Sequence, residues 1–352
     1  MLFNSAEFIF LFLPISLLLF FYLAKRKDNE VAIASLVVSS LFFYGWWNPS
    51  YLVLLLTSMV LNYQLGKHLG NNNNKKLLTV GVFLNLAAIA YFKYAGFIVF
   101  NLNTITGENW NLGNIILPLA ISFFTFQQIA YLVDSYKGIT KEYSFLHYAL
   151  FVSFFPQLIA GPIVHHKDML PQFSSIKRYQ VNSTNFKIGL TIFAIGLFKK
   201  TVLADGVSIY ATPIFDLADS GNNIDFFMAW GGSLAYTFQL YFDFSGYSDM
   251  AIGLARLFGI VLPLNFYSPY KAANISEFWR RWHITLSHFL RDYVYIALGG
   301  NRNGKIKRYS NLFITMLLGG LWHGAGWNFI IWGALHGTYL MINLAWQATK
   351  LR

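Results

Sequence analysis

The sequence predicts an all-α, polytopic integral membrane protein, and three observations lead to this fold class. Charged residues make up only 12% of the 352 residues, about half the share of an ordinary soluble domain. Hydrophobic residues make up 56%. Several apolar runs reach the roughly 17–25 residues that a helix needs to cross a bilayer. Since no other part of the chain offers a water-soluble core, we expect a single domain over residues 1–352 with the lipid bilayer as its solvent.

The expected membrane spans follow the apolar runs, in chain order, at 8–24, 31–46, 51–66, 77–100, 115–134, 186–203, 226–242, 309–322 and 326–347. The first run lacks the basic segment that opens a signal peptide, so we expect it to stay as an uncleaved span. The apolar segment 145–163 contains Pro156 and Pro162. Prolines break a spanning helix, and we therefore expect a re-entrant or half-buried segment there.

Charges in the loops predict the orientation of the chain. Basic residues at Lys25–Lys27, at 67–76, and at Lys137 and Lys141 follow alternate spans, whereas the segment 205–225 carries aspartates and no Lys or Arg. The positive-inside rule then places the N-terminus outside and the basic segment 268–310 at the cytoplasmic face. This topology explains most of the net charge of +11, and an anionic substrate at the basic face is the second interpretation. We expect no nucleic acid partner.

The chain contains no cysteine, which excludes a thiolate metal site and an acyl-cysteine intermediate. The neighbouring residues His165 and His166 have no carboxylate framework around them. Adjacent residues on a helix also point about 100° apart, so we expect no metal site.

The strongest candidate residue is His323, in LWHGAGWNF (321–329). Between Tyr309 and Thr349 there is no Asp, Glu, Lys or Arg. Close helix packing explains the surrounding glycines but not an imidazole, and ionisable groups inside a membrane usually mark function. His336 lies 13 residues further on. On one continuous helix it would face away, about 20 Å along the axis, so His283 is the more natural partner.

His283 lies in NISEFWRRWHITLSHFLRDYVY (274–295). Asn274 followed by Glu277 resembles a capping box and predicts the start of a half-buried, interfacial helix. Glu277 and Arg281 are one turn apart and able to pair. From the residues alone, His283 is either an interfacial histidine with a satisfied hydrogen bond or a functional group.

Two further polar clusters stand next to apolar runs. Asp243 and Ser245, in QLYFDFSGYSDM (239–250), are expected just past the end of a span, where they form either a polar helix end or the lining of a cavity. Gln127, Gln128 and Asp134 are expected to make hydrogen bonds between helices.

Six segments together resemble the membrane-bound O-acyltransferases, in the bacterial branch of the alginate O-acetylation membrane subunit. These segments are LPLAISFFTFQQIAYLVDSYKG (117–138), FFPQLIAGPIV (154–164), GLFKKTVLAD (196–205), YFDFSGYSDMAIGLARLFGI (241–260), FWRRWHITLSHFLRDYVYI (278–296) and LGGLWHGAGWNFIIWGALHG (318–337). They occur in the order of the family, and the resemblance extends over most of the chain. Many relatives in this branch carry further helices beyond the last residue of this chain. We therefore expect either a short member of the family or a chain from which the C-terminal part is absent.

The resemblance implies a ring of about nine to eleven tilted transmembrane helices around a thinned central tunnel, with re-entrant and interfacial helices. It implies that His323 is the catalytic histidine and that His283 is the second family histidine. The candidates for lining the tunnel or contacting substrate are Trp322, Asp243, Ser245, Trp282, Arg281 and Asn328.

The function expected from this resemblance is an O-acyltransferase of the bacterial plasma (inner) membrane with no bound cofactor. The donor would be acetyl-CoA or a phosphopantetheinyl carrier thioester on the cytoplasmic side. The acceptor would be a hydroxyl of an exported, alginate-like polysaccharide or of peptidoglycan, reached through an extracytoplasmic acetyltransferase partner. The alternatives are D-alanyl transfer from a carrier protein to teichoic acid, transfer to a lipid, and a transporter or scaffold without acyl chemistry.

Overall fold

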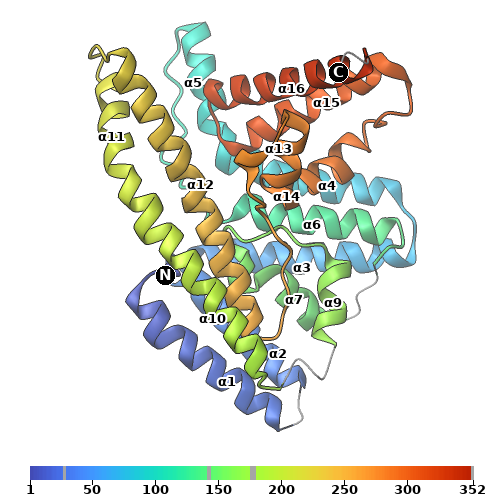
Figure 1. The fold of residues 1–352 in the computed structure, drawn as a ribbon. Coiled ribbons are helices and arrows are strands. Elements are labelled where there is room, and N and C mark those ends of the chain that lie inside the picture. Colours follow the sequence, from blue (N-terminus) through green and yellow to red (C-terminus); the bar gives the residue numbers. More distant parts are fainter. Residues whose placement is uncertain (27–28, 141–143, 175–179, 350–352) are drawn as a thin grey trace. The chain divides into compact units, whose positions relative to one another are not determined.

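The apolar runs of the sequence form helices in the computed structural model, which describes residues 1–26, 29–140, 144–174 and 180–349. Every regular element within these ranges is helical (Figure 1). The chain forms two compact units, Met1–Leu56 with Ser144–Leu264 and Thr57–Tyr143 with Asn265–Arg352. We call them the first and the second unit and describe each by itself. Lys27 and Lys141, which were used to predict the orientation, lie outside the described residues.

The first unit is built from these elements, in chain order: η1 (Phe8–Phe12), α1 (Leu13–Lys25), α2 (Asn29–Gly45), the start of α3 (Ser50–Asn71), α7 (Phe145–Ser153), α8 (Phe155–Leu158), α9 (His166–Phe173), α10 (Ser183–Phe198), η4 (Lys199–Ala204), α11 (Asp205–Asp219) and α12 (Phe226–Leu257). Its core is a cluster of phenylalanine rings. Phe8 and Phe155 are both fully buried, with ring centroids 6.0 Å apart.

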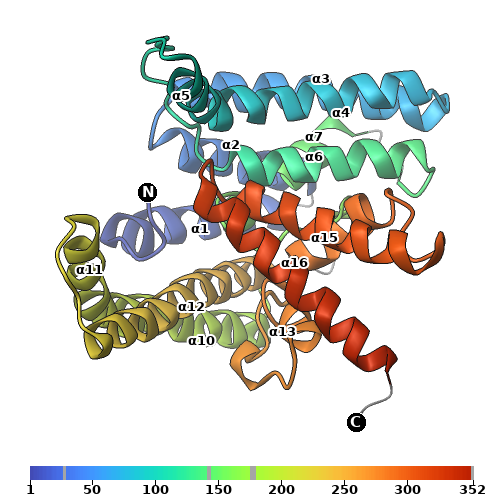
Figure 2. The same cartoon turned by 90° about the horizontal axis from the view of Figure 1, so that it is seen from above.

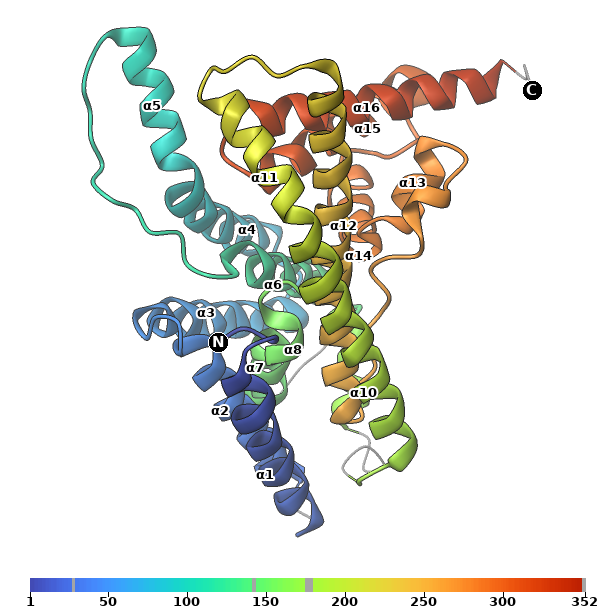
Figure 3. The same ribbon diagram turned by 60° about the vertical axis from the view of Figure 1, so that its left-hand side comes forward.

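Helices α10 and α12 lie side by side in the first unit (Figures 1 and 3). Glycines allow their backbones to meet. A Cβ atom on Gly196 would lie 2.6 Å from the carbonyl oxygen of Gly246, and one on Gly189 would lie 2.8 Å from that of Gly253. Such close approach strengthens van der Waals contact between helices that have no hydrophobic driving force in lipid.

The second unit contains the rest of α3 together with α4 (Lys75–Ile89), η2 (Ala90–Tyr94), α5 (Ala95–Thr106), α6 (Ile121–Tyr136), η5 (Pro269–Lys271), α13 (Ile275–Arg281), α14 (Ile284–Phe289), η6 (Leu290–Tyr295), α15 (Gly304–His323) and α16 (Trp327–Ala348). Helices α4 and α6 run alongside each other (Figure 2). The π-helical turn η2 joins α4 directly to α5 (Figure 3). Asn62 and Asn85 exchange buried amide hydrogen bonds of 3.3 and 2.6 Å between α3 and α4.

Three helices among the described residues are long and apolar enough to span a bilayer: Phe8–Lys25, Lys75–Thr106 and Trp327–Ala348. The helix Asn29–Gly45 is apolar but shorter. The break expected within 145–163 is confirmed, because α7 ends at Ser153 and α8 begins at Phe155, next to Pro156. The segment from α13 to η6 is broken after Arg281, and neither α13 nor the continuous helix Ile284–Tyr295 is long enough to cross hydrocarbon.

The structure corrects several predicted boundaries. Helix α12 runs to Leu257 rather than ending near residue 242, so Asp243 lies inside it and not past its end. Lys199 and Lys200 of η4 form ion pairs with Asp249 and Asp243 of α12. Because their charges are paired, these aspartates are accommodated inside the helix. The expected loop 205–225 contains helix α11. Helix α6 begins at Ile121, three residues after Pro118, and not near residue 115.

Candidate functional site

The strongest sequence candidate, His323, stands at a break between two helices. Helix α15 ends at His323, the backbone is extended at Gly324 and Gly326 (φ −170° and −172°), and α16 begins at Trp327. The turn brings α16 back against α15 (Figures 1 and 2). A Cβ atom on Gly320 would lie 2.8 Å from the Cα of Gly333. Gly320 therefore serves helix contact, as expected, and His323 is exposed at the end of α15.

This turn changes the relation between His323 and His336. On one continuous helix the two would face apart, but the return of α16 brings His336 back towards His323. Three histidines and two tryptophans then form a row of rings in the order His283, Trp322, His323, Trp332 and His336. Successive ring centroids lie 6.0, 4.9, 4.9 and 4.4 Å apart. We call these five residues the histidine–tryptophan row.

Trp322 joins the two sequence-predicted histidines. Its ring stacks on Phe126 of α6, with centroids 5.5 Å apart and planes at 23°. Phe126 in turn stacks on Phe289 of α14 at 4.3 Å. The indole Nε1 of Trp322 is buried and has no hydrogen-bond partner among the described residues. An unpaired buried donor costs about 1–3 kcal/mol, so this N–H is a candidate for binding a substrate oxygen.

His283 is held in a strained and fully buried position. Its φ of 41° lies in the left-handed region, which costs a non-glycine residue about 1–2 kcal/mol. The continuous helix expected over 274–295 is therefore wrong, because the chain turns at Trp282 and His283 between α13 and α14. The imidazole Nδ1 lies 3.1 Å from the amide oxygen of Asn265. Strain of this kind persists where the surrounding structure enforces it, often at functional sites.

Asn265 fixes which ring nitrogen of His283 carries the proton. The same amide oxygen accepts hydrogen bonds from the backbone N–H and the hydroxyl of Thr285, at 3.3 and 3.0 Å. It therefore acts as an acceptor, and His283 donates from Nδ1. Burial lowers the pKa of His283 to about 3. The imidazole is thus neutral at neutral pH, with Nε2 in its acceptor form.

The environments of the two histidines differ in access. The side chain of His283 is 1% exposed, whereas His323 is exposed. A reacting group must reach its substrate, and a supporting group need not. The geometry therefore suits His323 for contact with substrate and His283 for support through Trp322.

Arg281 and Trp282 occupy fixed positions before His283. The guanidinium of Arg281 donates to Glu277 at 2.9 and 2.7 Å, which confirms the expected ion pair. Asn274 caps α13 by accepting from the N–H of Glu277 at 3.0 Å, and the Glu277 carboxylate accepts from Ala273. The hydrogen bond from the backbone N–H of Ala273, followed by that from the Arg281 side chain, lowers the pKa of Glu277.

Trp282 packs among aromatic rings and is 8% exposed. Its ring stacks on Phe278 at 5.7 Å and meets Phe266 edge-on at 5.1 Å. Asn328 lies in the first turn of α16 and is exposed. It is close to the turn that follows His323, whereas Trp282 serves packing next to His283.

Asp243 and Ser245 belong to the first unit, whereas both catalytic candidates belong to the second. Asp243 pairs with Lys200 of η4 at 2.7 Å, and Lys200 also pairs with Asp205 at 2.7 Å. Ser245 is buried, and its hydroxyl has no hydrogen-bond partner among the described residues. Within the first unit, Asp243 therefore joins α12 to η4, and Ser245 is buried in α12.

Several residues of the site carry no local sequence signal. Asn265 lies 18 residues before His283, so no short motif connects the two. Trp332 lies within an apolar run that resembles any other membrane span. Lys93 and Tyr94, in the middle of an expected span, donate hydrogen bonds to the carbonyl oxygens of Trp322 and Leu321. A lysine inside an apolar run was a usable signal for Lys93.

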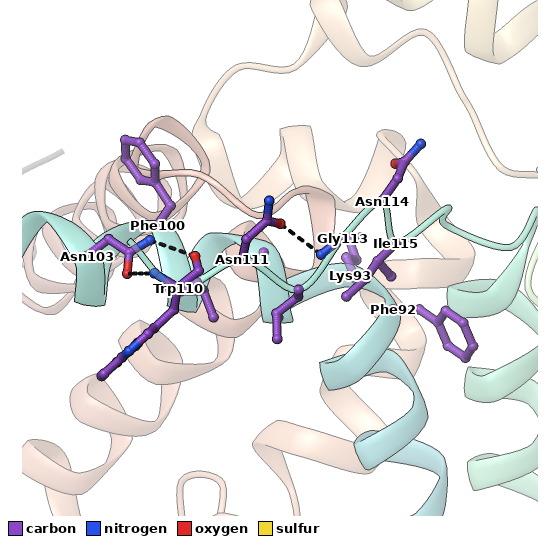
Figure 4. Close-up of a pocket in the computed structure, with 12 residues that line it drawn as sticks. Phe92, Lys93, Phe100, Asn103, Trp110, Asn111, Gly113, Asn114 and Ile115 are labelled. Atoms are coloured by element: carbon purple, nitrogen blue, oxygen red, sulfur yellow. Dashed lines mark hydrogen bonds between the residues drawn. The ribbon is translucent and has the colours of Figure 1, made fainter. Parts of the chain in front are cut away.

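A cavity of about 440 Å³ lies in the second unit between α5 and the segment that follows it (Figure 4). Lys93 lines it, together with Phe100 and Trp110. The side-chain amides of Asn103 and Asn111, which line the cavity, form hydrogen bonds with the backbone of the segment after α5. Asn103 bonds both backbone groups of Trp110 at 2.8 and 3.0 Å, and Asn111 accepts from Gly113 at 2.8 Å (Figure 4).

The described residues contain no group of three or more His, Asp or Glu side chains placed to hold a metal ion. The groups that the histidine–tryptophan row offers for chemistry are imidazoles and indole N–H donors. Together, an accessible base and a buried donor match what acyl transfer to a hydroxyl requires.

Comparison with known proteins agrees with this chemistry. A sequence model of the membrane-bound O-acyltransferase family matches residues 134–349, which include the whole histidine–tryptophan row. The chain belongs to the membrane-bound O-acyltransferase family. It is therefore an enzyme that transfers acyl groups and an integral membrane protein, as the sequence predicted.

The chain is 50% identical over 377 aligned residues to a peptidoglycan O-acetyltransferase of Helicobacter pylori, covering 99% of this chain and 71% of that protein. It is 44% identical over 355 residues to a probable alginate O-acetylase of Azotobacter vinelandii, covering 98% and 69%. A teichoic acid D-alanyltransferase of Streptococcus thermophilus is 28% identical over 357 residues, covering 97% and 83%. The chain is thus more similar to the O-acetylating relatives than to this D-alanyl-transferring one.

Proposed function

We propose that this enzyme transfers an acetyl group to a hydroxyl, with His323 as the catalytic base. The observation that carries the proposal is the position of His323 in the histidine–tryptophan row. It is exposed at a helix break, between the indoles of Trp322 and Trp332, and the adjacent Trp322 Nε1 is a buried donor without a partner.

The proposed reaction uses these groups in sequence. A neutral His323 takes the proton of the acceptor hydroxyl as its oxygen attacks the thioester carbonyl carbon. The new C–O bond forms, and the carbonyl oxygen becomes an oxyanion that the Trp322 N–H stabilises. The C–S bond then breaks, and the proton on His323 passes to the leaving thiolate. The products are an ester and a free thiol, so atoms and electrons balance without a cofactor.

His283 supports this step without needing to touch the acceptor. The ring, held by Asn265, is tilted by 60° against the ring of Trp322, with centroids 6.0 Å apart. A neutral ring next to Trp322 adds no charge to the site. It also avoids a second positive charge that would oppose protonation of His323 during the reaction.

The names of the relatives support acetyl as the acyl group and an exported polymer as the acceptor. We propose a hydroxyl of peptidoglycan or of an alginate-like polysaccharide, reached through an extracytoplasmic acetyltransferase partner. The donor is acetyl-CoA or a phosphopantetheinyl carrier thioester. The basic segment 268–310, on the proposed cytoplasmic face, suits a donor that carries phosphate.

The finer membrane arrangement is also part of the proposal. We propose a ring of about nine to eleven tilted helices around a thinned tunnel, in a bacterial plasma membrane, with the N-terminus outside. The break at Gly324–Gly326 supports a tunnel, because non-helical backbone at membrane depth must face protein or water. D-alanyl transfer from a carrier protein is the second candidate, favoured only by the 28% identical relative.

The testing experiment measures acetyl transfer from radiolabelled acetyl-CoA in membranes that contain the wild type, His323→Gln or His68→Gln. His68 is an exposed histidine on α3 and serves as the matched control. We expect His323→Gln to lose at least about 100-fold in rate, the usual contribution of a positioned base, and His68→Gln to keep full activity.

The outcomes separate the candidates. Full activity in a folded His323→Gln would refute the mechanism. If the wild type consumes only a D-alanyl carrier thioester, the second candidate is correct. Consumption of no thioester, with or without the partner, would favour a transporter or scaffold.

A further inference from the structure

Two neighbouring side chains of the second unit hold the end of the helix that carries His323. Tyr94 donates its hydroxyl hydrogen to the carbonyl oxygen of Leu321 at 2.5 Å. Lys93 donates to the carbonyl oxygen of Trp322, the residue directly before His323. The ammonium of Lys93 also lies 5.6 Å from the centroid of the Trp322 ring.

These two carbonyl groups need partners because of where α15 ends. The last four carbonyls of a helix have no donor within the helix, and here they include those of Leu321 and Trp322. The next residue, Gly324, is extended, so the chain forms no left-handed cap that would supply backbone N–H groups. The donors come instead from α4–η2–α5, more than 220 residues earlier in the chain.

Charge adds to the hydrogen bonds. The C-terminal end of a helix carries a partial negative charge of about half an electron, and a cation there is stabilising. Lys93 is half-buried, in a chain segment that is otherwise apolar. Burying a lysine costs free energy unless its charge has a partner. The partner here is the negative end of α15, where Lys93 donates to the carbonyl oxygen of Trp322.

The local backbone of Lys93 and Tyr94 is unusual as well. Both residues lie in the π-helical turn η2, Ala90–Tyr94, between two regular helices. Single π turns inside α-helices are rare and frequent at functional sites. The side chains of this turn make the two bonds to α15.

We propose that Lys93 and Tyr94 are positioning residues that hold the end of α15, and with it Trp322 and His323, in the geometry of the reaction. This inference rests on the proposed role of His323. Neither residue touches the reacting atoms in this scheme. Each acts by fixing a backbone carbonyl within two residues of the base.

The kinetic test compares Lys93→Met and Tyr94→Phe with the wild type in acetyl transfer. Because a misplacement of about 1 Å costs about 100-fold in rate, we expect kcat to fall by about 10- to 100-fold while KM for acetyl-CoA changes less than about twofold. Lys93→Arg keeps a cationic donor and should recover part of kcat. A residue that bound the donor would instead raise KM.

Matched controls are available nearby. Tyr91→Phe removes an exposed hydroxyl from the same π turn, and Lys76→Met removes an exposed cation from α4. Both should keep the kinetics of the wild type. A loss of kcat in Tyr91→Phe as large as in Tyr94→Phe would mean that the turn tolerates no change, and the specific positioning would be refuted.

A second readout does not need turnover. Since the chain has no cysteine, a single Ala325→Cys accepts one nitroxide label in the turn between α15 and α16. We expect its spectrum to show a more mobile turn when Lys93→Met or Tyr94→Phe is added, and no change with Tyr91→Phe. An unchanged spectrum would overturn the positioning role even if kcat falls. If Lys93→Met and Tyr94→Phe make the turn more mobile but the wild type shows no acetyl transfer, the positioning role would be supported and the proposed function refuted.

Discussion

The packing of Gly320 against α16 gives a prediction that connects helix contact with catalysis. In Gly320→Ala, the new methyl group would lie 2.8 Å from both the Cα and the nitrogen of Gly333, and it would also meet the carbonyl oxygen of Phe329. All three neighbours are backbone atoms. They cannot rotate away, so the two helices have to separate or shift.

The size of this shift follows from van der Waals distances. Carbon atoms pack best at about 3.5–4.0 Å, so the contact to Gly333 must lengthen by about 1 Å. Overpacking of this kind costs about 1–3 kcal/mol in stability. His323 lies three residues beyond Gly320, at the end of the helix that moves. A displacement of about 1 Å at a reacting group lowers the rate about 100-fold, so activity should suffer more than folding.

The assay is acetyl transfer from radiolabelled acetyl-CoA, measured beside the thermal midpoint of the purified protein in detergent. Gly231→Ala is the matched control, because a Cβ atom there meets nothing within 4 Å. Gly337→Ala should be intermediate, since its closest neighbour, at 3.0 Å, is the ring of Phe313, which is able to move. Gly320→Ala with the rate of the wild type would refute the argument that α15–α16 contact sets the position of His323.

Two further predictions concern the histidine–tryptophan row. Trp322→Phe keeps an aromatic ring and removes the Nε1 donor, so kcat should fall by about 100-fold with little change in KM; a variant with the kcat of the wild type would exclude this donor from the oxyanion site. The pKa of His283 is about 3 in the folded protein, against an ordinary value of 6.5. Below pH 6.5 the unfolded chain therefore binds a proton at this residue that the folded protein does not bind. Stability should therefore be unaffected above that pH and fall by about 2 kcal/mol on going down to pH 5. His283→Asn should remove this part of the acid sensitivity, and parallel pH curves of unfolding for the two proteins would contradict the buried neutral state.

The class of fold and the candidate His323 were predictable from the sequence, because both depend on properties of a single chain segment. Low charge and long apolar runs predict membrane helices because each property belongs to a segment by itself. His323 was a candidate because it lies in a stretch of 41 residues, Tyr309 to Thr349, that contains no Asp, Glu, Lys or Arg. Placing an ionisable group inside a membrane costs free energy, so such a group usually has a function. The ion pair of Glu277 with Arg281 and the cap at Asn274 were predictable as well, since both depend on residues within one turn of helix.

Only the tertiary structure decided which distant residues meet these local features. The return of α16 brings His336 into the row through Trp332, where a continuous helix would have carried it away. The left-handed backbone at His283 is enforced by the bonds around Asn265, not by its own preference. Lys93 and Tyr94 reach α15 from more than 220 residues away. Periodicity and capping are encoded in neighbouring residues, whereas the partner of a helix end is chosen by how whole helices pack.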